Sequence, residues 1–335
     1  MIDQSFLDSI FSNLEKKTEV TPTGVLIIDS TNLFIRSYSV STHINRNGDH
    51  IGGLVGFLRS LGFIVRDFKP RKIILVFDGE GNSTNKKYLF PDYKANRGTG
   101  RVINYKIHNS KEEEEESMEN QMGRLIQYLK QLPVSLVSIS NYEADDVIGY
   151  LSNKYKEKEE VIVVSTDRDY YQLVEKNVKV YNPRIKMLVD ENYIFNEFGV
   201  YPHNFLTLKI LIGDTSDNIP GVQGMKEKTT LKLFPEMGTR DVITLSDIYR
   251  LSEERIADNK IYSRLLGFTY QLEINKKIMN IMEPNIDGTY EQTINESIDY
   301  VNEMGAHNFR LLADVDRIGD SFHESWVRDS FGYLK

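Results

Sequence analysis

Nine carboxylates stand in five short clusters whose spacing could support metal-dependent chemistry. They are Asp29, Asp78, Glu143, Asp145, Asp146, Asp167, Asp169, Asp214 and Asp217. The sequence has no cysteine, and its six histidines are scattered rather than paired at ligand spacing. Carboxylate ligands without thiolate or paired imidazole favour Mg²⁺ or Mn²⁺ over zinc. Two such ions, about 4 Å apart, can hold the attacking and leaving oxygens of a phosphoryl substitution.

The position of these acids relative to apolar runs predicts that they converge. Apolar residues fill 25–28 before Asp29, 73–77 before Asp78 and 161–164 shortly before Asp167. Continuous apolar runs are typical of strands buried on both faces of a parallel sheet, and helical patterns occupy 52–68, 112–132 and 143–156 between them. The carboxyl ends of parallel strands share one edge, where such sheets place their active crevice. Singly, each acid also suits a helix cap or a turn, but together they indicate one site.

Residues 86–111 form a basic insertion after the second strand. They contain seven Lys or Arg and one Asp, with Tyr88, Tyr93 and Tyr105 interleaved, and show no clean periodicity of a strand or a core helix. The acidic run 112–116 follows and suits the first turns of a helix, where the dipole favours negative charge. The segment is either a solvated surface loop or a nucleic-acid contact.

Length, charge and composition set the outer limits. The 335 residues predict one large or two coupled domains, and from about residue 201 the chain has helical patterns to its end. No apolar run has the length of a membrane span or a signal peptide, and the absence of cysteine fits a reducing cytoplasm. The formal charge of −8 argues against a nucleic-acid partner, but setting the nine clustered acids aside leaves about as many acids as bases. Residues 1–22 space apolar side chains four apart, as an amphipathic helix would, for packing on the domain or docking to a partner.

Six motifs resemble the 5′ nuclease superfamily, which contains flap endonucleases, the 5′-nuclease domain of bacterial DNA polymerase I and free-standing bacteriophage 5′ nucleases. In chain order they are IIDSTNLFIRSY, LVFDG, PDYKANR, YEADDVIGYL, STDRDYYQL and GDTSDNIPGVQGMKEKTT, between about residues 25 and 234. The resemblance implies an α/β fold with a central, mostly parallel sheet flanked by helices. It divides the chain into an N-terminal extension 1–22, a PIN-like nuclease core 23–200 with a helical arch at about 86–111, and a helical region 201–335. The last region would hold a helix–hairpin–helix-type element at about 214–234.

The resemblance also implies roles for individual side chains. Asp29, Asp78, Glu143 and Asp145 would hold one metal ion, directly or through water, and Asp146, Asp167, Asp169, Asp214 and Asp217 would complete a second site. Lys94 and Arg97 would stabilise the scissile phosphate, while Tyr93 would stack on a base. Lys86, Lys87 and Arg101, expected farther up the arch, would contact DNA phosphates and set affinity and salt dependence.

The hairpin element would hold duplex phosphates without reading bases. The resemblance assigns this to Gly221, Gly224, Lys228 and Thr229, together with a K⁺ ion. Lys226 departs from the pattern because the family usually has glycine there, so a positive φ would strain the turn. Either the Lys226 ammonium replaces the K⁺ and contacts a phosphate, or the turn is shifted and Lys226 starts the next helix in solvent.

The expected function is therefore a monomeric, Mg²⁺-dependent 5′-3′ exonuclease and flap endonuclease, with Mn²⁺ as a substitute. Its partners would be branched or 5′-ended duplex DNA during replication or primer removal, alongside a separate polymerase. Three alternatives stay open: an RNase H-type exonuclease that removes RNA primers from RNA–DNA hybrid, a non-catalytic structure-specific DNA-binding protein, and a PIN-type ribonuclease. The last two fit less well, because all nine acids are present and PIN-type chains generally lack the arch and hairpin.

Overall fold

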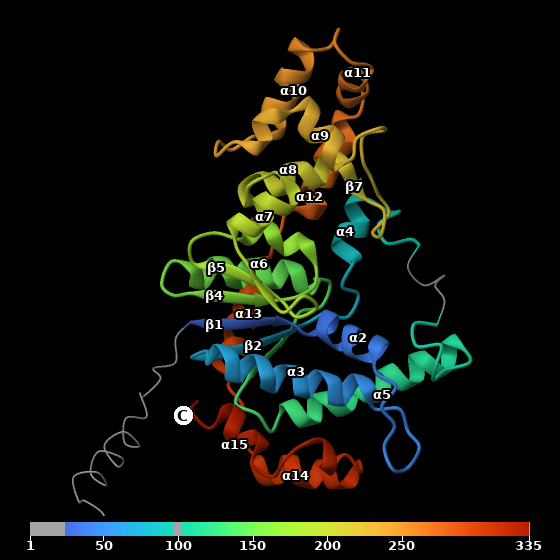
Figure 1. Ribbon diagram of the computed structural model, residues 1–335, viewed down its shortest axis with the longest axis vertical. Helices are drawn as coiled ribbons and strands as arrows, with labels where there is room; N and C mark the ends of the chain where they lie inside the picture. The colour runs from blue at the N-terminus through green and yellow to red at the C-terminus, as the bar shows by residue number, and fades with distance from the viewer. Residues whose placement is uncertain (1–23, 97–101, 335) are drawn as a thin grey trace, which may run out of the picture.

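The computed structural model describes residues 24–96 and 102–334, arranged around one six-stranded sheet (Figure 1). In spatial order the strands are β3 Ser135–Ser138, β2 Lys72–Phe77, β1 Val25–Asp29, β4 Val161–Val164, β5 Val178–Asn182 and β6 Met187–Val189. The first five run parallel, and β6 pairs antiparallel with β5. The expected mostly parallel central sheet is confirmed.

Two hydrophobic cores lie on the two faces of the sheet, because successive side chains of a strand point in opposite directions. On β1, Val25 and Ile27 belong to one core, while Leu26 and Ile28 belong to the other. The first core packs under α6 Ala144–Lys156. The second packs under α2 Ser30–Val40, α3 Gly52–Phe68 and α5 Lys111–Leu129. Burial on both faces explains why these strands are uninterrupted apolar runs.

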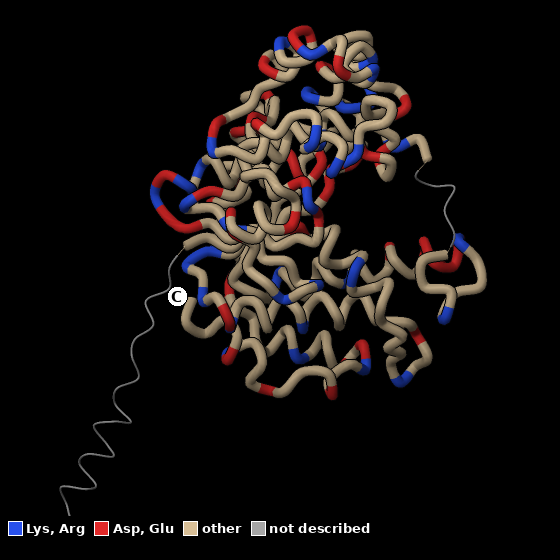
Figure 2. The backbone as a smooth tube through the Cα atoms, turned by 45° about the horizontal axis from the view of Figure 1, so that its top comes forward, with Lys and Arg blue, Asp and Glu red and all other residues tan. Residues whose placement is uncertain are grey.

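The basic insertion is helical only in part. Among its described residues, α4 Thr84–Leu89 is the one helix, and residues 90–96 and 102–110 have none. The first of these two segments, residues 90–96, is tied to the C-terminal region, where Asn218 Nδ2 donates to the Asp92 carbonyl at 2.8 Å. The second is tied to α2, where Asn104 Nδ2 donates to the Tyr38 carbonyl at 3.0 Å. The backbone view of Figure 2 shows these two segments standing apart from each other. Arg97 and Arg101 lie outside the described residues, as does the extension 1–22.

Helices dominate the chain after the sheet. A first group contains α7 Glu191–Phe198, α8 Pro202–Ile212, α9 Glu227–Leu233, α10 Leu245–Glu254, α11 Lys260–Leu266 and α12 Thr269–Met279. Between α8 and α9, the short strands β7 Gly213–Asp214 and β8 Ile219–Pro220 form a hairpin. Among the described residues, no helix combines the length and apolar character needed to cross a membrane.

The last helices leave this group and return to the nuclease core (Figure 1). They are α13 Gly288–Asp299, α14 Ala306–Val315 and α15 Trp326–Phe331. α13 lies against β3, and α15 packs on α3. Trp326 stacks on Phe309 with ring centroids 5.1 Å apart, and both join the core under α3 and α5. The sequence placed these residues in one region with 201–280, because helical periodicity does not show which surface a helix covers.

Candidate active site

The three strand-end acids meet at the carboxyl edge of the sheet. Asp29 ends β1 and caps α2, with Asn32 N donating to its Oδ1 at 3.0 Å. Asp78 follows β2, and its Oδ1 accepts from Ala144 N at 2.9 Å, which joins it to the start of α6. Asp167 follows β4 and caps the 3₁₀ helix η1 Arg168–Leu173. Each carboxylate is therefore oriented by a backbone donor at the start of a helical segment.

The start of α6 supplies the tightest group of acids. Glu143 is the residue before the helix, and Asp145 and Asp146 lie in its first turn. One carboxylate oxygen from each lies within 4.8 Å of the others, a spacing that can hold a metal ion. Unpaired N–H groups at the N-terminus of a helix favour this concentration of negative charge.

A second group of acids comes from η1 and the β7–β8 hairpin. Lys209 of α8 bridges them, with Nζ 2.8 Å from Asp169 Oδ1 and 2.7 Å from Asp214 Oδ2. Asp217, in the turn of the hairpin, faces Tyr93, whose OH lies 3.4 Å from Asp217 Oδ2. Electrostatic interactions link each of the nine predicted acids to at least one other, so the structure brings all nine together.

Burial and mutual repulsion raise the pKa values of several of these acids. Burial raises the pKa of Asp29 to about 7, with further contributions from Asp78 and Asp167. Burial likewise raises the pKa values of Asp146 and Asp169 to about 7. Burial would also raise the pKa of Asp214, but the ammonium of Lys209 lowers it to about 2. Carboxylates that resist ionisation together, in a site without sulfur ligands, fit hard divalent cations that would share their charge.

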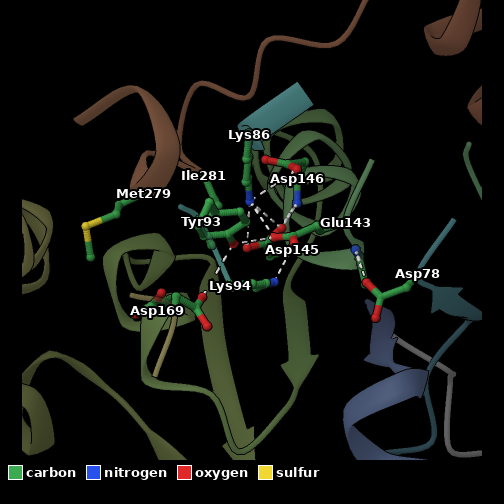
Figure 3. A network of polar contacts seen from close by, with 12 residues as sticks. Asp78, Lys86, Tyr93, Lys94, Glu143, Asp145, Asp146, Asp169, Met279 and Ile281 are labelled. Atoms are coloured by element: carbon green, nitrogen blue, oxygen red, sulfur yellow. Dashed lines mark hydrogen bonds and ion pairs between the residues drawn. The ribbon is translucent and has the colours of Figure 1, made fainter. Parts of the chain in front are cut away.

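Two lysines and a tyrosine from the basic insertion point into the first acidic group (Figure 3). Lys86 Nζ lies 2.9 Å from Glu143 Oε2, 3.0 Å from Asp145 Oδ1 and 3.3 Å from Asp146 Oδ2. Tyr93 OH donates to Glu143 Oε2 at 2.8 Å, and the Lys94 ammonium pairs with Glu143 Oε1. Glu143 thus accepts from all three side chains.

Two expected positions in this segment are wrong. Lys86 was expected on the exposed arch, but its side chain is buried, because the helical turn of α4 directs it at the acids and away from its exposed neighbour Lys87. Tyr93 was expected to offer its ring to a base, but only 2% of it is exposed and it belongs to the core beside α6. The DNA contacts of Lys87 stay a prediction, as does the role of Lys94 at the scissile phosphate.

The expected strain at Lys226 is also wrong. The positive φ of the turn falls on Gly224, at 91°, while Lys226 is extended, with φ −139°, at the position just before α9. Lys226 and Lys228 are exposed and Thr229 is half-buried at the start of this helix. Gly221 is required for a different reason, since an added Cβ would lie 2.1 Å from the Ile212 carbonyl oxygen. Lys226 thus lies in solvent at the start of α9, as one of the two interpretations expects, and both its contact with a phosphate and K⁺ binding stay predictions.

Comparison with known families adds sequence support to this geometry. The family model described as "5′-3′ exonuclease, N-terminal resolvase-like domain" matches residues 24–199, and "5′-3′ exonuclease, C-terminal SAM fold" matches residues 200–299. The chain belongs to the 5′-3′ exonuclease family. The acids of the site therefore lie in the two segments that define this exonuclease family, and residues 300–335 lie beyond them.

Individual relatives are similar over most of this exonuclease-family chain. A 5′-3′ exonuclease of Buchnera aphidicola subsp. Schizaphis graminum is 31% identical over 262 residues, which are 74% of this chain and 84% of that protein. The DNA polymerase I of Lactococcus lactis subsp. cremoris is 28% identical over 306 residues, 87% of this chain. The chain spans about a third of that polymerase, since the match covers 33% of its length.

Solved structures share the fold at low sequence identity. The bacteriophage T5 flap endonuclease, crystallised with DNA and metal ions, has a TM-score of 0.63 at 18% identity and covers 88% of this chain and 99% of its own. Human GEN1 in complex with Holliday junction DNA has a TM-score of 0.56 at 12% identity, covering 94% of this chain and 72% of its own. Both comparisons confirm the nuclease-type fold.

The sequence did not predict three polar contacts of this exonuclease site. Lys209 is the first, and its signal was a single charge within the otherwise apolar end of α8. The others are Ser165 and Tyr170, whose hydroxyls each donate to Asp29 Oδ2 at 3.1 Å. A hydroxyl next to an acidic motif gives no sequence signal, because its partner depends on how the strand and η1 pack.

Proposed function

We propose that this protein is a Mg²⁺-dependent nuclease that hydrolyses phosphodiester bonds at 5′ ends and 5′ flaps of DNA. The observation that carries the proposal is the single network of nine acids at the carboxyl edge of the sheet, flanked by Lys94. Membership of the 5′-3′ exonuclease family supports the reaction class. The relatives crystallised with DNA and metal ions support the choice of partner and of a divalent cation.

The acids and Lys94 would have different roles at the site. Glu143, Asp145 and Asp146 would hold a cation through the oxygens that already lie within 4.8 Å of one another. Bound Mg²⁺ would supply an activated water and neutralise charge on the phosphate, and Mn²⁺ would substitute for it. Lys94 would place a positive charge where negative charge shifts during phosphate transfer.

The proposed substrate is branched or 5′-ended duplex DNA. The start of α9 and the turn at Gly224 would face the duplex, where exposed backbone N–H groups and Lys228 suit phosphates without base recognition. We further propose that the protein acts as a monomer in the cytoplasm, during replication or primer removal. The DNA polymerase I relatives support this setting, because they carry a similar segment within a longer chain.

One experiment tests the reaction and separates it from its alternatives. A 5′-labelled flap, a nicked duplex and an RNA–DNA hybrid are incubated with Mg²⁺, with Mn²⁺ or with chelator, using wild type and Asp29→Asn. Cleavage of the flap by wild type only, with either metal and not with chelator, supports the proposal. Preferred cleavage of the hybrid would favour an RNase H-type exonuclease, and DNA binding without cleavage under any condition would favour a non-catalytic DNA-binding protein.

A further inference from the structure

A buried ammonium occupies the centre of the candidate metal site. Lys86 is only 6% exposed, and its Nζ lies within 3.3 Å of Glu143, Asp145 and Asp146 at once. The positive charge of Lys86 is thus balanced by the same three carboxylates that would bind a divalent cation.

The ammonium and a divalent cation would compete for the same three acids. A bound ion would sit about 2.1 Å from its ligand oxygens, whereas Nζ lies 2.9 to 3.3 Å from one oxygen of each acid. A divalent cation would therefore take over contacts that the ammonium now makes, and repulsion between the two cations at short range in a buried site would favour departure of the monovalent one. We propose that Lys86 is an internal counterion that holds the cation position in the metal-free protein and is displaced when a divalent cation binds. This inference rests on the proposed function, because it takes the acids at the start of α6 as a metal site.

Displacement of Lys86 would also release the segment that carries it. α4 has only six residues, and the Lys86 side chain ties it to the acids. The Lys86 carbonyl accepts from Phe90 N at 2.9 Å, which ties α4 to the turn before Tyr93. Tyr93 and Lys94 keep their own contacts with Glu143. Metal binding would therefore loosen α4 while Tyr93 and Lys94 remain in place, and the freed ammonium would face an incoming phosphate instead of the carboxylates.

The first test measures metal affinity without DNA. Mn²⁺ binding is followed by electron paramagnetic resonance for wild type, Lys86→Met and Lys87→Met. Removing the competing ammonium should tighten Mn²⁺ binding tenfold or more, about 1.4 kcal/mol. Lys87→Met is the matched control, because it removes the same charge from the adjacent, exposed position of α4 and should leave the affinity unchanged. Equal affinity in wild type and Lys86→Met, or equal tightening in both variants, would overturn the proposal.

The second test uses the wild type alone and does not depend on whether Lys86→Met folds. Backbone amide hydrogen exchange is measured over residues 84–89 with and without saturating Mn²⁺. Displacement predicts at least tenfold faster exchange in α4 when the metal is bound, although metal binding should protect α6. Unchanged or slower exchange in α4 would mean that Lys86 stays with the acids, and the inference would be wrong. If Mn²⁺ does not bind at all, the proposed function fails as well, so the two failures are distinguishable.

Discussion

Two substitutions of Lys94 can distinguish the contribution of its charged side chain to catalysis from the effect of its backbone conformation on stability. Lys94 has a left-handed φ of 55°, its N–H donates to the Asp217 carbonyl at 2.8 Å, and its ammonium lies 4.9 Å from the centre of the Tyr93 ring. A non-glycine residue in this conformation costs roughly 1 kcal/mol or more, and the ion pair with Glu143 offsets that cost. Lys94 thus places its ammonium beside Glu143 at the expense of a strained backbone conformation.

Lys94→Ala and Lys94→Gly should lose the same catalytic contribution but differ in stability. Both remove the ammonium, and loss of a preorganised group at the reacting phosphate costs about 100- to 1000-fold in the single-turnover rate, roughly 3–4 kcal/mol. Only Lys94→Gly also relieves the left-handed strain, so it should be more stable than Lys94→Ala by about 1 kcal/mol.

The rates are measured on a 5′-flap substrate at saturating enzyme, the affinities by fluorescence anisotropy in Ca²⁺, and the stabilities by urea denaturation. Equal rates for wild type and Lys94→Ala, with a change only in Kd, would refute the assignment of Lys94 to the chemical step. A less stable Lys94→Gly would refute the argument from backbone strain.

Three further predictions follow from the same contacts. Asp29→Asn should abolish cleavage while DNA affinity, measured by anisotropy, stays within a few-fold or increases, because one negative charge facing the phosphates is removed. Burial lowers the pKa of His50 below its ordinary value of 6.5, and its ring nitrogens already contact the Ser41 carbonyl and the Gln121 amide. The unfolded chain therefore binds a proton at His50 more readily than the folded protein does. The stabilising contribution of neutral His50 is present above pH 6.5 and is lost as pH falls through the pKa of the folded state. In urea denaturation at a series of pH values, His50→Gln should lose less stability over this range than wild type. Trp326→Ala should destabilise the protein by about 3–5 kcal/mol by circular dichroism, and a loss below 1 kcal/mol would show that the returning C-terminal helices contribute little to the core.

The sheet and the acidic site could be predicted from the sequence, because both have patterns that can be recognised without knowing the tertiary structure. Strands buried on both faces must be continuous apolar runs, and an acid just after such a run must lie at the carboxyl edge. Asp29 and Asp78 follow that rule, and the parallel register of β1 with β2 pairs Asp29 with Val76, two residues before Asp78. The position of α15 on α3 had no such pattern, because an apolar helix stripe does not specify which surface it covers.

Lysine positions were predicted less well, because a lysine side chain is long enough to reach in several directions from one backbone position. Lys86 and Lys87 are adjacent in a basic segment, yet one is buried among acids and the other is exposed. The turn of α4 decides between them, and the sequence of this segment gave no helical periodicity from which to derive that turn. The prediction of a strained backbone at Lys226 was wrong for a related reason. The positive φ of the turn lies at Gly224, and its position depends on how β8 leads into α9.

The charges of the site explain why these lysines are needed and why they are insufficient. Lys86, Lys94 and Lys209 each pair with acids of the network, but three ammoniums cannot neutralise nine carboxylates. Burial, together with this excess of negative charge, raises the pKa values of Asp29, Asp146 and Asp169 to about 7. Two divalent cations would offset most of that excess, and DNA would then meet a site with little net charge instead of a repulsive one. The overall charge of −8 is thus compatible with a nucleic-acid substrate, because much of it lies in the carboxylates proposed to bind the metal.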